Sequence, residues 1–151
     1  MTRTLLASAA ALAISAATAH ADGHIAFPIG EGPFSWDSYN AWAENAPDLS
    51  GQTVTVFGPW LTPEDGYLDN ALAYFEEATG ADVIYTGSDS FEQQIVIDAE
   101  AGSAPNVSVF PQPGLAAVMA GKGQLSPLGD DMASWVADNY AAGQSWVDLG
   151  T

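Results

Sequence analysis

Short runs of alternating polar and apolar residues punctuate the middle of the chain, and they are rich in β-branched and aromatic side chains. The clearest is Thr53-Val54-Thr55-Val56-Phe57; residues 106–110 repeat the alternation, and residues 82–85 form a shorter β-branched run. Alternation with a period of two is typical of strands, because successive side chains then point to opposite faces of a sheet. The pattern therefore predicts three strands.

Apolar residues at three- and four-residue spacing follow the predicted strands, which is typical of amphipathic helices. The predicted helices span residues 67–79, 89–101, 113–120 and 130–140. The residues expected on their buried faces are Leu68, Ala71, Leu72, Phe75, Ala78, Phe91, Ile95, Ala99, Trp135, Val136 and Tyr140. Strands that alternate with helices indicate βαβ units, so the predicted fold class is α/β, with a mostly parallel sheet flanked by helices.

Local signals predict where these helices begin and end. Gly80 and Gly102 follow the first two helices, and glycine readily takes the left-handed conformation that ends a helix. Asp89 and Glu92 have the spacing of a capping box, so we expect Asp89 to be the N-cap of the second helix. Pro113 suits the first position of the third helix.

The N-terminal residues carry the pattern of a secretory signal peptide. Arg3 precedes an apolar, alanine-rich stretch over residues 5–17, and Ala19-His20-Ala21 fits the small-x-small cleavage pattern. We therefore expect residues 1–21 to be removed after Ala21 and the protein to be exported. An N-terminal membrane anchor is the alternative, but the apolar stretch is shorter than the about 20 residues that a spanning helix needs.

The remainder of the chain divides at about residue 50. Residues 22–50 carry several prolines and glycines and predict an irregular arm with one short helix, near Trp36 to Glu44. Residues 51–151 then form the predicted folded domain, and their length is enough for one core.

Charge and cysteine content exclude several functions. From Asp22 onward the chain holds all 19 acidic residues and Lys122 as its one basic residue. Binding of nucleic acid by charge attraction is therefore excluded, and anionic ligands and membranes are disfavoured. The acidic residues are scattered, which favours a solvated surface over a cation site. Without cysteine the chain has no disulfide, thiolate metal site, cysteine nucleophile or lipid-modified cysteine, so we expect a freely diffusing periplasmic protein.

Polar and aromatic side chains follow each predicted strand, at the edge where ligands bind in parallel sheets. The candidate ligand residues are Trp60, Glu64, Asp65, Ser88, Asp89, Glu92 and Gln112. A tryptophan offers a flat apolar face to a sugar ring. Carboxylates accept hydrogen bonds from sugar hydroxyls, and hydroxyls and amides can both donate and accept them. The pattern therefore predicts a site for a small hydroxylated ligand.

Five of these residues also have a purely structural interpretation. Trp60 could pack in the core, Glu64 and Asp65 could be solvated, and Asp89 with Glu92 could serve only the helix cap. A hydrolase would need two carboxylates that flank a scissile bond, and spacing alone cannot pair them. His24 lies in the irregular arm, which argues against a serine triad. No phosphate loop, dinucleotide fingerprint or metal motif is present, so no cofactor is predicted.

From residue 51 onward the chain resembles the substrate-binding proteins of ABC sugar importers, and most of all the alpha-glucoside-binding proteins of proteobacteria. The motifs that carry this resemblance are GQTVTVFGPW (51–60), YFEEATG (74–80), SDSFEQQI (88–95), FPQPG (110–114) and YAAGQSWVD (140–148). The FEEATG pattern is widespread in the superfamily, whereas the SDSFEQQI and FPQPG patterns together are much more specific.

The resemblance implies a periplasmic-binding-protein-like fold in which two lobes close on a sugar. It implies capture without chemistry, transient docking of a monomer on permease subunits in the inner membrane, and ligand-facing turns at residues 60–65, 88–92 and 110–112. Family members run to several hundred residues, so we expect this chain to be part of the first lobe and to bind sugar weakly by itself. A secreted carbohydrate-active hydrolase and a binding protein for a glucosylated compatible solute are the alternatives.

Overall fold

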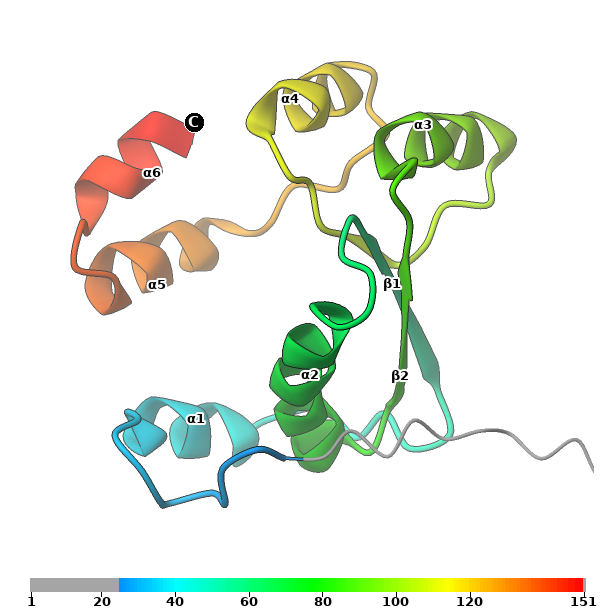
Figure 1. The fold of residues 1–151 in the computed structure, drawn as a ribbon. Helices are drawn as coiled ribbons and strands as arrows, with labels where there is room; N and C mark the ends of the chain where they lie inside the picture. Colours follow the sequence, from blue (N-terminus) through cyan, green and yellow to red (C-terminus); the bar gives the residue numbers. More distant parts are fainter. Residues whose placement is uncertain (1–24, 151) are drawn as a thin grey trace, which may run out of the picture.

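The computed structural model describes residues 25–150 of the chain. The predicted signal peptide and His24 therefore lie outside the described residues. The helices and strands are α1 (Trp36–Ala43), β1 (Thr53–Gly58), α2 (Asp65–Thr79), β2 (Asp82–Gly87), α3 (Phe91–Ala101), β3 (Val107–Ser108), α4 (Pro113–Gly121), α5 (Asp130–Asn139) and α6 (Gln144–Gly150). In Figure 1, α2 lies beside the strands, α3 and α4 lie near their upper ends, and α5 and α6 stand apart on the left.

β1 is the central strand of a three-stranded parallel sheet with the order β2-β1-β3. It pairs with β2 along its whole length, from Thr53 opposite Asp82 to Gly58 opposite Gly87. The predicted α/β class, with a parallel sheet flanked by helices, is confirmed.

The third strand is much shorter than the predicted run over residues 106–110. β3 contains only two residues, opposite Val56 and Phe57 of β1. The side chain of Asn106 takes over the next position, because its Oδ1 accepts hydrogen bonds from both the backbone N and the Oγ1 of Thr55, each at 2.9 Å. A side-chain bond of this kind competes with the backbone ladder, so the regular pairing begins only at Val107.

One hydrophobic cluster lies on the face of the sheet to which Phe57 points. Phe57 packs there with Phe91 and Ile95 of α3 and with Met119 of α4, and the last three are each only 1% exposed. The Phe91 ring lies 4.9 Å from that of Phe57 and 5.5 Å from that of Phe110, centroid to centroid. The buried face predicted for α3 is therefore correct for Phe91 and Ile95.

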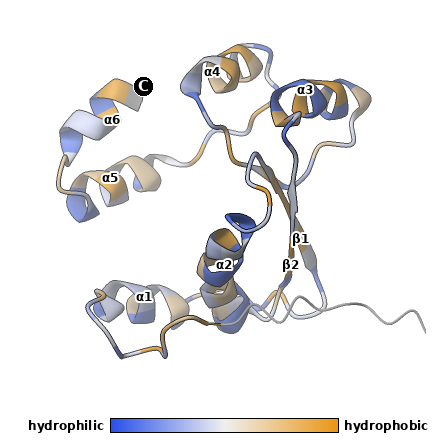
Figure 2. Cartoon of the chain, viewed as in Figure 1, coloured by the Kyte–Doolittle hydropathy of each residue, from blue (hydrophilic) through white to orange (hydrophobic). Residues whose placement is uncertain are grey.

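A second cluster lies on the opposite face, to which the neighbouring residue Val56 points. Val56 packs with Val83 of β2, and Leu72 and Phe75 of α2 cover them. The predicted face of α2 needs a correction, since the fully buried residues of this helix are Ala73 and Thr79, and Ala71 is exposed. Figure 2 shows hydrophobic and hydrophilic residues alternating around α2 and α3, as expected of helices that cover a sheet with one side.

The N-terminal arm packs against α2 through aromatic rings and two tyrosine hydroxyls. Trp42 of α1 stacks on Phe75 of α2, with ring centroids 5.9 Å apart and an angle of 26° between the planes. Tyr39 donates to the carbonyl of Tyr74 at 3.0 Å. The Tyr74 hydroxyl in turn accepts from the backbone N of Phe27 at 3.2 Å and donates to its carbonyl at 2.7 Å.

α5 and α6 pack mainly on each other, and Tyr140 between them stacks on Trp146 with ring centroids 5.3 Å apart. Trp135 is 49% exposed and Tyr140 47% exposed, so the prediction that these two residues enter the core is wrong for this chain. The residues after Gly143 form α6. Within residues 25–150, no helix is both long and apolar enough to cross a membrane.

The position of Phe91 predicts a large loss of stability for Phe91→Ala. The ring is 1% exposed between two other phenylalanines, and removing a buried phenylalanine costs about 3–5 kcal/mol of unfolding free energy. Ile97→Ala on the same helix is the control, because Ile97 is 57% exposed. This change should lower the unfolding free energy by only a small fraction of the loss expected for Phe91→Ala. Urea denaturation followed by circular dichroism measures both, and equal losses would contradict the assigned core.

Candidate ligand-binding site

The turns that follow the three parallel strands lie next to one another. They comprise residues 59–64 after β1, residues 88–90 after β2 and residues 109–112 after β3. Two backbone bonds tie them to the strand ends: Ser88 N donates to Gly58 O at 3.0 Å, and Val109 N donates to Phe57 O at 2.9 Å. We call these three turns the strand-end rim. Every ligand residue predicted from the sequence lies in this rim or in the first turn of the helix that follows.

Trp60 is held at the rim by its backbone. The hydroxyl of Tyr85, on β2, accepts from Trp60 N at 3.0 Å and donates to Trp60 O at 3.1 Å. The indole side chain belongs to neither hydrophobic cluster, and the residue is 38% exposed. The structure therefore favours a surface position over the core position that sequence left open. Tyr85 has no motif of its own, and sequence reasoning missed it.

Of the two acidic residues after Trp60, Asp65 accepts hydrogen bonds from neighbouring residues and Glu64 is exposed. Asp65 accepts from Thr62 Oγ1 at 2.8 Å and from Gly66 N at 2.9 Å, so its carboxylate stabilises the start of α2. This bonding also explains why α2 begins at Asp65, two residues before the predicted start. Glu64 precedes the helix and is exposed.

The turn after β2 differs from the predicted capping box. α3 begins at Phe91, and Ser90 rather than Asp89 is its N-cap, with no side-chain cap bond. The predicted cap by Asp89 is therefore wrong. The chain makes one more turn first, in which Ser90 N donates to Ser88 Oγ and Ser90 Oγ donates to Asp89 Oδ1, both at 3.1 Å. The Asp89 side chain is exposed, and the hydroxyl of the N-cap residue donates to it.

Gln112 and Glu92 meet across the rim. Gln112 is the N-cap of α4, and its Oε1 accepts from Gly114 N at 2.6 Å and from Leu115 N at 3.3 Å. Its Nε2 donates to Glu92 Oε1 at 3.3 Å, which links α4 to α3. The side chains of Gln112 and Glu92 are therefore hydrogen-bonded to each other. Sequence contained a signal for this cap, because Pro113 at the first helical position places residue 112 at the N-cap.

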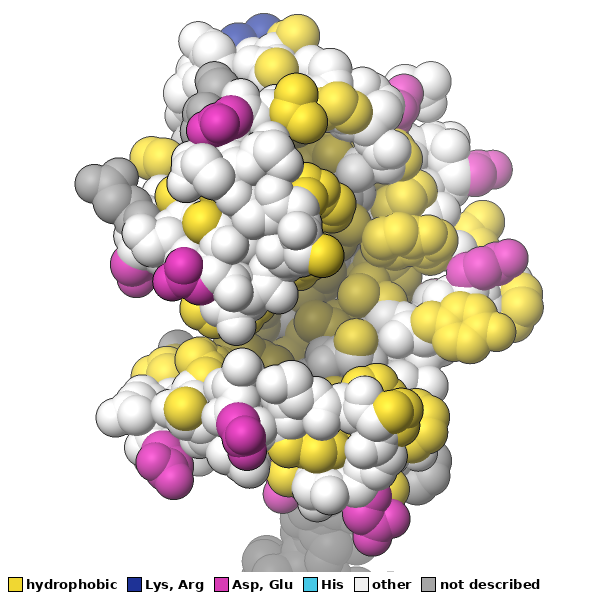
Figure 3. Space-filling view, turned by 90° about the vertical axis from the view of Figure 1, so that its left-hand side faces the viewer, with side chains coloured by type: hydrophobic (Ala, Val, Ile, Leu, Met, Phe, Trp, Pro, Cys, Tyr) yellow, Lys and Arg dark blue, Asp and Glu magenta, His cyan; other side chains and the backbone are white. Residues whose placement is uncertain are grey.

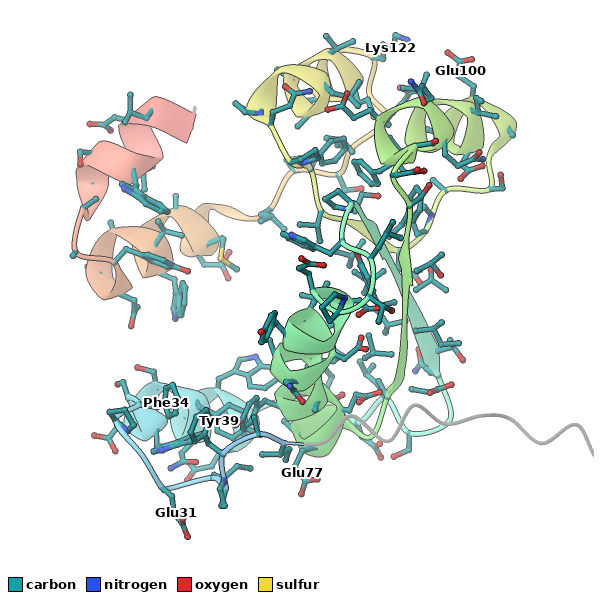
Figure 4. The ribbon with its side chains drawn as sticks, in the orientation of Figure 1. Glu31, Phe34, Tyr39, Glu77, Glu100 and Lys122 are labelled. Carbon is teal, nitrogen blue, oxygen red and sulfur yellow. The ribbon has the colours of Figure 1, made fainter. Side chains whose placement is uncertain are left out.

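The start of α2, directly after the rim, is negatively charged. Burial raises the pKa of Asp69, and the carboxylate of Asp65 adds to the rise. Burial also raises the pKa of the Tyr85 phenol; the hydrogen bond with the Trp60 backbone opposes this rise, and Asp65 and Asp69 add to it. Within residues 25–150 the one cationic side chain is that of Lys122, whose ion pair with Glu100 spans 3.6 Å at the far end of α4 (Figure 4).

Two aromatic hollows lie away from the rim, around α1. One, of about 550 Å³, lies between the arm and α2 and includes Phe27, Trp36 and Tyr74 in its lining. The other, of about 690 Å³, lies between α1 and α5 and includes Trp42 and Trp135. Figure 3 shows hydrophobic side chains gathered around a central hollow, whereas the carboxylates are scattered over the outer surface.

The scattered carboxylates do not form a metal centre in the part of the chain that the structure describes. No group of three or more histidine, aspartate or glutamate side chains among residues 25–150 is arranged to hold an ion. The rim offers instead an exposed indole, hydroxyls and carboxylates, which are groups that bind neutral hydroxylated molecules.

Two curated proteins are similar to this chain. The alpha-glucosides-binding periplasmic protein AglE of Rhizobium meliloti is 48% identical over 157 aligned residues, which cover 100% of this chain and 34% of that protein. The osmoprotective compounds-binding protein GgtB of Synechocystis is 38% identical over 102 residues, which cover 68% of this chain and 24% of that protein. The chain therefore spans about a third of the length of the first relative. No family model and no solved structure matches it.

The packing at Gly87 predicts that Gly87→Ala disturbs the rim. An added Cβ would collide with the carbonyl oxygen of Trp60, so the turn after β1 must shift and unfolding free energy should fall by about 1–3 kcal/mol. Gly66→Ala is the matched control, because nothing lies within 4 Å of its added Cβ. That change, inside α2, should be neutral or stabilise by about 0.5–1 kcal/mol. Urea denaturation would reject the packing if the two variants were equally stable.

The bonds of Gln112 predict a graded series of variants. Gln112→Ala removes the cap of α4 and the link to Glu92, and should lower the unfolding free energy by about 1 kcal/mol. Gln112→Asn should retain most of that stability, because asparagine is itself a good N-cap. Gln93→Ala, at an exposed position of α3, is the control. Thermal melts compare the four proteins, and a loss in the asparagine variant as large as that in the alanine variant would contradict the capping role.

Proposed function

By sequence the chain belongs to the periplasmic solute-binding proteins, and on that premise we propose that it forms part of the first lobe of a protein that captures an alpha-glucoside or a related oligosaccharide. The observation that carries this proposal is the 48% identity along the whole chain to an alpha-glucosides-binding periplasmic protein. The rim supports it independently, since three strand-end turns with polar and aromatic side chains converge where parallel sheets bind ligands.

At the rim, we assign the ligand contacts by the exposed surface and the unused hydrogen-bonding capacity of each side chain. Trp60 offers its indole to the apolar face of a sugar ring. The Ser88 hydroxyl can donate a hydrogen bond to a sugar hydroxyl, and the Asp89 carboxylate can accept one. Glu64, Asp65, Glu92 and Gln112 remain predicted contacts. Asp65 and Gln112 already bond to the backbone, so their first contribution is to keep the turns in place.

The charge of the chain supports a neutral ligand. Formal net charge is −17 over 151 residues, and beside the rim burial and the nearby Asp65 carboxylate both raise the pKa of Asp69. Such a surface repels phosphorylated or carboxylated solutes and accepts hydrogen bonds from hydroxyl groups. A neutral oligosaccharide meets both conditions.

The proposed task is capture and delivery in the periplasm, without chemical change to the ligand. The lobe described here would supply one wall of a cleft, and a second lobe would close on the bound sugar by a hinge movement. The closed monomer would then dock transiently on the permease of an ABC importer. Because one wall encloses a ligand poorly, the chain alone should bind more weakly than the full-length protein.

A second ligand class has a specific observation in its favour. The relative from Synechocystis is named for osmoprotective compounds, so a glucosylated polyol is the second candidate for the same cleft. A hydrolase is not favoured, since both relatives are named as binding proteins.

Replacement of Trp60 tests the proposed site. In the full-length protein, Trp60→Ala should weaken binding of maltose, trehalose or a glucosylated polyol at least about tenfold, equal to 1.4 kcal/mol, as measured by isothermal titration calorimetry. Trp42→Ala is the matched control, because Trp42 is exposed to a similar degree, 42% against 38%, but lies on α1.

Two results would each overturn one part of the proposal. Equal affinity in the Trp60 and Trp42 variants would overturn the assigned site, and recovery of free monosaccharide after incubation of the unaltered protein with the disaccharides would overturn the role of capture without chemical change. Recovery of intact sugar, together with selective loss in the Trp60 variant, is the expected outcome.

A further inference from the structure

Tyr85 makes two hydrogen bonds with the turn after β1. Its one hydroxyl bonds to both backbone polar groups of Trp60, accepting from N at 3.0 Å and donating to O at 3.1 Å. The β1–β2 pairing ends at Gly58 opposite Gly87, so Trp60 lies beyond the last strand pair. The phenol of Tyr85 therefore supplies the partner that a further strand residue would have supplied.

Two glycines leave the space that these contacts need. An added Cβ at Gly58 would lie 2.9 Å from the Tyr85 hydroxyl, and one at Gly87 would collide with the Trp60 carbonyl. The backbone of residue 60 thus lies directly against Gly87 of β2, and the Tyr85 hydroxyl lies directly against Gly58 of β1. These four residues, Gly58, Trp60, Tyr85 and Gly87, form what we call the Trp60 seat.

The seat fixes the backbone of Trp60 while its side chain stays outside both hydrophobic clusters. A fixed backbone at residue 60 therefore contributes to the direction in which the indole projects. A binding surface that is already ordered loses less conformational freedom when the ligand arrives, and binds more tightly for that reason.

We propose that Tyr85 is a positioning residue, which holds Trp60 in the orientation that meets the sugar ring. This inference rests on the proposed function. Tyr85 does not itself touch the ligand; its effect on affinity passes through Trp60.

The same device occurs elsewhere in the chain and provides a matched control. The Tyr74 hydroxyl bonds to both backbone polar groups of Phe27, at 3.2 Å and 2.7 Å, in the N-terminal arm (Figure 4 shows the neighbouring Tyr39 and Phe34). Tyr85→Phe and Tyr74→Phe each remove one oxygen atom and two hydrogen bonds, but only the first lies at the rim.

The experiment compares Tyr85→Phe, Trp60→Ala, the double variant and Tyr74→Phe in the full-length protein. Calorimetry with maltose and with trehalose measures affinity, and hydrogen exchange measures protection of the Trp60 amide without ligand. We expect Tyr85→Phe to weaken binding about three- to tenfold and to speed exchange at Trp60. In the Trp60→Ala background the same change should alter affinity by less than about twofold, because coupled residues are not additive. Tyr74→Phe should leave affinity unchanged.

The outcomes separate this inference from the proposed function. An equal loss of affinity from Tyr85→Phe with and without the indole would overturn the positioning role and leave the proposed function standing. Unchanged exchange at Trp60 would also overturn it, whatever the affinity. If the unaltered protein bound neither sugar, the proposed function would fail and the ligand role of Tyr85 with it. Faster exchange with selective, non-additive loss of affinity supports the proposal.

Discussion

The parallel pairing of β1 with β2 is the constraint on which the rest of the structure depends. Its register runs without a break over six residue pairs and ends at Gly58 opposite Gly87. Because Val56 and Phe57 point to opposite faces, the pairing also divides the core into the cluster under α2 and the cluster under α3 and α4. Parallel strands need crossover connections, so the helices that cover the sheet are also the segments that begin at the rim.

Side chains complete the hydrogen bonding where the regular pairing stops. Backbone polar groups need partners, and irregular segments have no ladder to supply them. Asn106 bonds to Thr55 beside the short β3, and Gln112 caps α4. Tyr85 and Tyr74 each serve both polar groups of one residue. In a solute-binding protein, order of this kind in the turns would present the ligand with a surface that is already formed.

The candidate site could be predicted in outline but not in the role of each residue. The strand-helix alternation was enough to place Trp60, Ser88 and Gln112 on one rim, since parallel strands carry their following turns at the same edge. Assignments that depend on a shift of one residue failed: the capping-box spacing favoured Asp89, but the extra turn made Ser90 the N-cap. Tyr85 could not be found, because its partner Trp60 lies 25 residues away along the chain.

By itself, the sequence determined the fold class, the C-terminal ends of α2 and α3, and the kinship with solute-binding proteins. These depend on local periodicity, on glycines that take left-handed conformations, at φ 70° for Gly80 and φ 71° for Gly102, and on similarity along the chain. Only the tertiary structure decided which distant groups meet, as Tyr85 meets Trp60 and Gln112 meets Glu92, and that Trp60 stays outside both hydrophobic clusters. The physical reason is that a polar side chain takes the partner nearest in space, and that partner depends on how distant segments pack.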